Sequence, residues 1–153
     1  MKTEKWNLNL LHHTTFTMAI NNVAQMFDET DDYALARQTE LAGFITRQDI
    51  DYLLNKLYTH DLSQKLEMTF DDILLLYTAL DLSAKLTLSH QGDKKRQELK
   101  LEDNSNIDPN VQRGFEGLLQ MSSVFVRNLT KEYEHVPAFK ARMMELEKLN
   151  AYI

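Results

Sequence analysis

The chain contains no cysteine. Disulfide bonds, thiolate metal sites and a cysteine nucleophile are therefore excluded. Glycine occurs only four times and proline only twice in 153 residues, although sheets and hairpins use both residue types at their turns. Because these turn formers are scarce while helix-forming Leu, Ala, Lys, Glu, Gln and Met are abundant, the composition predicts an all-α protein.

The chain also lacks an excess of cations and a long uncharged apolar run. The formal net charge is −6, which disfavours nucleic-acid binding because neutralising phosphates requires clustered Lys and Arg. The basic run at residues 94–100 is interrupted by Glu98, so we interpret it as a solvated loop. The most apolar stretch, residues 70–88, carries three Asp and one Lys, which argues against a membrane span. The first residues lack the apolar core of a signal peptide, and we expect a cytoplasmic protein.

Length and periodicity predict a single helical domain over residues 1–153. A chain of this size normally folds as one unit and buries roughly 68–70% of its extended surface. We expect a bundle of five to six helices, mostly up-and-down, with one long polar connection at about residues 91–108. The expected helices cover residues 7–27, 32–42, 47–58, 70–90, 109–133 and 137–153. The start of the first stays open, because Trp6, Leu8 and Leu10 also alternate as in a strand, and residues 60–68 are expected to be a connection.

The most informative stretch is the helix expected from residue 70. Thr69 precedes Asp72 by three residues, a spacing typical of a capped helix start. Apolar side chains then fall on two sides of the helix, Ile73, Leu76, Tyr77, Leu80, Ala84 and Leu88 on one and Leu75, Ala79, Leu82 and Leu86 on the other. A helix that is apolar on two faces must be covered on both. It is therefore the central helix of the bundle or a subunit interface, with Leu75, Leu82 and Leu86 as interaction residues.

Local signals also mark other helices. Thr46 with Asp49 predicts a capping box, and Pro109 and Pro137 are each expected near the first position of a helix. The expected inward stripe after Thr46 is Ile50, Leu53, Leu54, Leu57 and Tyr58. Gly114 and Gly117 lower helix propensity, so we expect another helix to approach closely there, with a ligand against the backbone as the alternative.

Glu132 and His135 form the sharpest candidate for metal chemistry. The Glu-x-x-His spacing places a carboxylate and an imidazole on one helix face, as in ferritin-like di-metal proteins. Those proteins use two such pairs, whereas this chain has one, so a surface Glu beside a His at a helix C-terminus is the alternative. His12 falls on the expected apolar stripe of the first helix, between Leu8 and Phe16, where it is either a packed core residue or a ligand.

Asp81 is a polar exception on the apolar side of the helix expected from residue 70. It lies near Tyr77, and Lys85 follows it by four residues. Either Asp81 and Tyr77 form a buried polar pocket in the bundle, or Asp81 pairs with Lys85 at an interface.

No catalytic motif occurs in the sequence. There is no Gly-rich phosphate loop, no Gly-x-Ser-x-Gly elbow and no dinucleotide-binding fingerprint. We therefore expect a non-enzymatic helical interaction or regulatory module without a cofactor, which binds another protein or itself as a homodimer. The alternative is a metal- or small-ligand-binding bundle, which could be enzymatic, with an interior site drawn from Glu132, His135, His12 and Asp81.

Overall fold

The structure, a computed structural model, describes residues 3–28, 44–84 and 109–148. Helices make up 74% of the described residues, which confirms the predicted helical class. The five helices in this part of the chain are α1 (Leu10–Asp28), α3 (Arg47–Tyr58), a helix at residues 70–84, α5 (Pro109–Tyr133) and α6 (Pro137–Glu147). The helix expected at residues 32–42 and the polar connection expected at 91–108 lie outside the described residues.

Two short strands form a sheet that the sequence prediction lacked. β1 (Thr3–Trp6) pairs antiparallel with β2 (Leu66–Thr69), with Trp6 opposite Leu66. The expected connection at residues 60–68 is therefore wrong over its last three residues, and α1 begins at Leu10 instead of residue 7. Each strand has only four residues, so its alternation is too short to distinguish from a loop by sequence alone. The strand reading of Trp6 was the alternative that proved right.

Both predicted capping boxes are present. The Thr46 hydroxyl accepts the Asp49 N–H at 3.1 Å, and the Asp49 carboxylate accepts the Thr46 N–H at 3.0 Å. Thr69 and Asp72 repeat these two bonds at 3.1 and 3.0 Å. Each box satisfies backbone donors that a helix N-terminus otherwise leaves unpaired.

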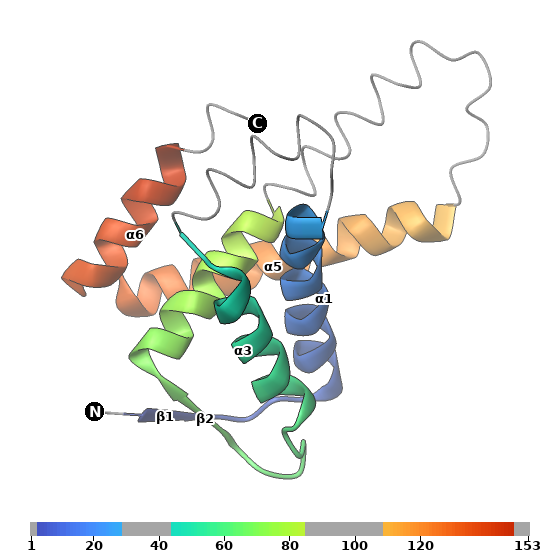
Figure 1. The fold of residues 1–153 in the computed structure, drawn as a ribbon, viewed down its shortest axis with the longest axis horizontal. Helices are drawn as coiled ribbons and strands as arrows, with labels where there is room; N and C mark the ends of the chain where they lie inside the picture. Colours follow the sequence, from blue (N-terminus) through green and yellow to red (C-terminus); the bar gives the residue numbers. More distant parts are fainter. Residues whose placement is uncertain (1–2, 29–43, 85–108, 149–153) are drawn as a thin grey trace.

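The 70–84 helix is the centre of the molecule, as predicted. In Figure 1 it is the light-green helix after β2, lying between α6 on one side and α1 and α3 on the other. Side chains on both of its predicted faces are at most 2% exposed, namely Ile73, Leu76, Tyr77, Ala79, Leu80 and Leu82. Burial of these residues removes apolar surface from water, which stabilises the fold by about 25 cal/mol per Å².

Each of the four other helices touches this central helix or its first residues through a named pair. Asn22 of α1 donates to the Ser83 hydroxyl at 3.1 Å. Tyr52 of α3 bonds to Asp72 at 2.7 Å. The Phe70 ring lies 6.1 Å from that of Tyr133 on α5, and the Tyr77 ring lies 4.4 Å from that of Phe139 on α6, between centroids. The central helix is thus wrapped by its own chain.

Two other sequence expectations differ from the structure. Tyr58, expected to face inward, is 60% exposed; it is the last residue of α3, and its hydroxyl accepts a hydrogen bond from Asn21 at 3.1 Å at the surface. A Cβ at Gly117 would meet nothing within 4 Å, so none of the described helices approaches closely there. The side-chain surroundings of Gly114 lie outside the described residues. α6 begins at Pro137, as expected, and its described part ends at Glu147.

α1 packs against both α3 and α5, and Figure 1 shows α5 passing across α1 and not alongside it. Among the described helices, none has the length together with the hydropathy that crossing a membrane requires.

Candidate functional site

Asp72, at the start of the central helix, is the most unusual side chain of the structure. Of the described Asp, Glu, Lys and Arg residues, it alone is buried, with 3% of its surface exposed. A buried carboxylate lowers stability unless it is paired and hydrogen-bonded, so Asp72 must have partners close by.

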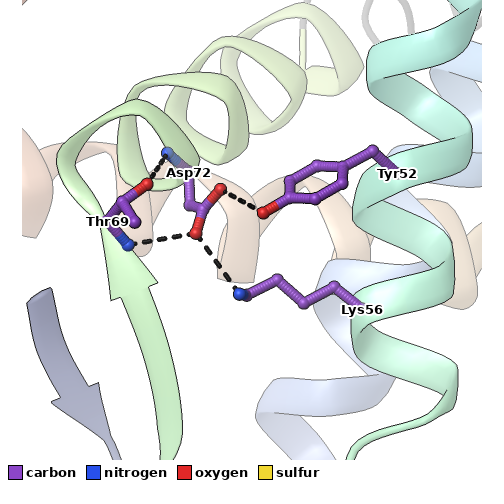
Figure 2. Close-up of polar contacts among 4 residues, drawn as sticks. All are labelled: Tyr52, Lys56, Thr69 and Asp72. Atoms are coloured by element: carbon purple, nitrogen blue, oxygen red, sulfur yellow. Dashed lines mark hydrogen bonds and ion pairs between the residues drawn. The ribbon is translucent and has the colours of Figure 1, made fainter.

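Three groups surround the Asp72 carboxylate, and Figure 2 shows them converging on it. One oxygen accepts the Tyr52 hydroxyl at 2.7 Å. The other accepts the Thr69 N–H at 3.0 Å and lies 3.3 Å from the Lys56 ammonium. We call Tyr52, Lys56, Thr69 and Asp72 the Asp72 cluster.

Local structure explains how the Asp72 cluster is assembled. Tyr52 and Lys56 are four residues apart on α3 and therefore lie on one face of that helix. The Lys56 ammonium also lies 5.9 Å from the centre of the Tyr52 ring. Asp72 is aimed at this face because its capping-box bond to Thr69 orients the carboxylate.

The surroundings of Asp72 and Tyr52 favour an ionised Asp72 carboxylate and a neutral Tyr52 hydroxyl. Burial raises the pKa of Asp72, but the hydrogen bonds from Thr69 and Tyr52 and the charge of Lys56 outweigh it, so this pKa lies below its usual value. The hydrogen bond to Asp72, then burial and the Asp72 charge, raise the pKa of Tyr52 to about 12. Proton transfer near neutral pH needs a group that titrates there. The cluster instead joins α3 to the central helix.

Tyr77 and Asp81 are brought near each other, which is what the polar-pocket interpretation requires. Tyr77 is 2% exposed. Burial, then the negative charge of Asp81, raise the pKa of Tyr77 to about 12, against a hydrogen bond with Thr130 that lowers it. Asp81 is half-buried, and Lys85, its alternative partner, lies outside the described residues. Tyr77 is therefore a buried, neutral phenol close enough to the half-buried Asp81 to feel its charge.

The other predicted metal residues are spread over the surface. Glu132 and His135 are exposed, and the half-buried His12 ring packs edge-on against Phe125 at 5.1 Å. Glu132 instead lies near Glu4 of β1: burial and the Glu132 charge raise the pKa of Glu4. Within the described residues, no three His, Asp or Glu side chains come together as a metal site.

Two hydroxyls that sequence reasoning did not single out are buried on α5. The Ser122 hydroxyl and the Tyr133 hydroxyl have no hydrogen-bond partner within the described structure. They are eleven residues apart on one helix, about 16 Å at 1.5 Å per residue, so they do not form one site. The sequence carries no signal for the burial of Ser122, because serine is more often exposed than buried.

Replacing Ser122 with Ala is expected to raise the free energy of unfolding by about 1 kcal/mol, since it removes a buried hydroxyl that has no partner. Ser83→Ala is the matched control, because both Ser83 and Ser122 are 0% exposed in helices. Ser83 accepts from Asn22 at 3.1 Å, so its replacement is expected to lower stability by about 1 kcal/mol. Urea denaturation of both variants measures the difference. Equal effects of the two substitutions would contradict this account of Ser122.

Comparison with known proteins does not identify the chain. No family model matches it, and no curated protein or solved structure is similar to it. The side chains described above and the surface of the helices are therefore the features that bear on function.

Proposed function

We propose that the protein acts by protein–protein contact, as a non-enzymatic helical module that associates with itself. The observation that carries this proposal is the surface of α1. Three large apolar side chains of this helix are strongly exposed, Leu10 at 69%, Leu11 at 58% and Met18 at 45%. Exposed apolar residues grouped on one element are typical of interaction surfaces.

The interaction surface differs from the one expected from sequence. Leu82 is 1% exposed in the single chain, so it is not available to a partner. Leu75 is half-buried, and Leu86 lies outside the described residues. We therefore propose that the interaction surface lies on α1, which packs against the central helix, and not on the central helix itself.

Half-buried polar side chains that bond to backbone carbonyls also support a structural role over a catalytic one. The His13 ring nitrogen donates to the Leu57 carbonyl at 2.8 Å, which joins α1 to the end of α3. Arg142 donates to the Phe44 carbonyl at 2.6 Å, which joins α6 to the segment before α3. These groups satisfy backbone acceptors and hold helices together.

Self-association is tested by measuring mass across concentration. Light scattering after size exclusion, from about 1 µM to about 500 µM, spans the range in which a dimer of micromolar affinity dissociates. We expect the mass to rise from that of one 17.9 kDa chain towards twice that value. A mass of one chain at every concentration, with no protein that co-purifies, would overturn the proposal.

The second candidate is a metal- or small-ligand-binding bundle, supported by Tyr77 and Asp81 lying near each other in the interior. A ligand that binds the folded state raises its thermal stability in proportion to the logarithm of ligand concentration. Elemental analysis of the untagged protein, followed by melting with zinc, iron or manganese, tests the metal version. No stoichiometric metal and an unchanged melting temperature would count against it.

A further inference from the structure

α1 is unusual because it carries almost no charge. Residues 10–27 contain no Asp, Glu, Lys or Arg, although these four types make up 26% of the chain. A helix at the surface of a globular protein normally presents charged and polar side chains on its outer face. The missing charge on α1 therefore needs an explanation beyond the packing of its inner face.

Up to residue 24, where the structure describes the side chains of α1, the outer face has five exposed residues, Leu10, Leu11, Thr14, Met18 and Asn21. At 100° per residue they fall within an arc of about 100°. Buried side chains of α1, such as Phe16 and Val23, lie outside this arc. Depletion of charge together with exposed large apolar residues is the composition of an interface core.

We infer that the outer face of α1 binds the same face of a second copy, with the two helices antiparallel about a two-fold axis near Thr14. This inference rests on the proposed self-association and adds the surface and its geometry. Thr14 lies at the middle of the face, both along the helix and around it, between Leu10 and Met18. A small residue at the crossing point lets two helices approach closely, while Leu10 packs against the partner's Met18.

A second copy fits this face better than a charged partner does. Charged groups of a partner would lose water against the outer face of α1 and gain no counter-charge there, which is unfavourable. A second copy brings a face without charge, so nothing is left unpaired. A two-fold pairing is also the commonest way in which identical chains associate.

The first test compares two Met residues that are exposed to a similar extent. Met18 on α1 and Met144 on α6 are 45% and 54% exposed, so Glu at either position is compatible with the fold. Met18→Glu buries two unpaired carboxylates in the dimer and is expected to weaken dimerisation at least about tenfold by sedimentation velocity. Met144→Glu is expected to leave the dimerisation constant unchanged. Circular dichroism of both variants checks that they are folded.

The second test uses the absence of cysteine. Thr14→Cys gives a chain with one thiol, and any disulfide dimer joins two copies of that position. A disulfide requires Cα atoms about 4.4–6.8 Å apart, which the two-fold axis near Thr14 provides. Under mild oxidation we expect Thr14→Cys to form covalent dimers quickly and Met144→Cys to form them slowly.

The outcomes separate this inference from the proposed function. If the wild type dimerises but Met18→Glu dimerises equally well, the outer face of α1 is not the interface, while self-association stands. If the wild type is a monomer throughout, both fail together. Loss of dimer in Met18→Glu with rapid cross-linking of Thr14→Cys supports both.

Discussion

Replacing Asp72 with Ala is expected to lower the free energy of unfolding by about 3 kcal/mol, because it removes one partner of a buried ion pair and leaves others without theirs. The Tyr52 hydroxyl loses its acceptor at 2.7 Å, and Lys56 loses its carboxylate at 3.3 Å. The Lys56 side chain is 24% exposed and reaches solvent in part, which keeps the loss near the lower end of what breaking a buried pair costs. The midpoint of urea denaturation measures the change.

The chain provides a matched control for Asp72 in Asp49. Both residues occupy the same position of a capping box and accept a backbone N–H at 3.0 Å. Within the described structure Asp49 contacts only Thr46 through its capping-box bonds, with no counterpart of Tyr52 or Lys56, so Asp49→Ala is expected to cost only about 1 kcal/mol. Similar losses in the two variants would show that Asp72 acts as a cap alone, and that Tyr52 and Lys56 add little.

The same cluster has a pH signature. The pKa of Asp72 is lower in the folded chain than in the unfolded one, so its contribution to stability is complete above the unfolded pKa. It is lost as the pH falls from about 4 through the folded pKa, because the unfolded chain then binds the proton more readily. The stability difference between wild type and Asp72→Ala should therefore shrink below about pH 4. A difference that stays constant down to acid unfolding would contradict the ionised state of Asp72.

The Asp72 cluster shows which contacts could be predicted from the sequence and which could not. The bond between Thr69 and Asp72 spans three residues, and local spacing was enough to predict it. Tyr52 lies twenty residues from Asp72, and its approach depends on how α3 packs against the central helix. No periodicity within either helix contains that information. The cap was therefore predictable, and the buried charge pair was not.

The surface of α1 shows a second kind of feature that the sequence did not predict. The expected stripe of the first helix included Phe16, which is 2% exposed, and that part of the prediction is confirmed. Leu10, Leu11 and Met18 fall off the stripe, and their exposure becomes evident only once the neighbouring helices are placed. The one signal available in the sequence was the absence of charge across residues 10–27. Charge patterning, and not hydrophobic period, could have drawn attention to this face.

Phe139→Ala is expected to cause the largest loss from a single core side chain, about 3–5 kcal/mol, by removing buried surface and leaving a cavity. Phe139 is 0% exposed, and its ring lies 4.4 Å from Tyr77 and 5.7 Å from Tyr133 between centroids. Within α6 only Phe139 and Leu146 are buried, so this ring is a principal anchor of α6 on the central helix.

The control on the same helix is Met144→Ala, which changes a side chain that is 54% exposed. Its effect is expected to stay within about 0.5 kcal/mol, since exposed substitutions remove little buried surface. Because Phe139 packs on Tyr77, its loss should also loosen α6, which faster amide hydrogen exchange in residues 137–147 would report. If Phe139→Ala costs no more than Met144→Ala, α6 is not held to the central helix by this ring, and the packing of Tyr77 must depend on its other neighbours.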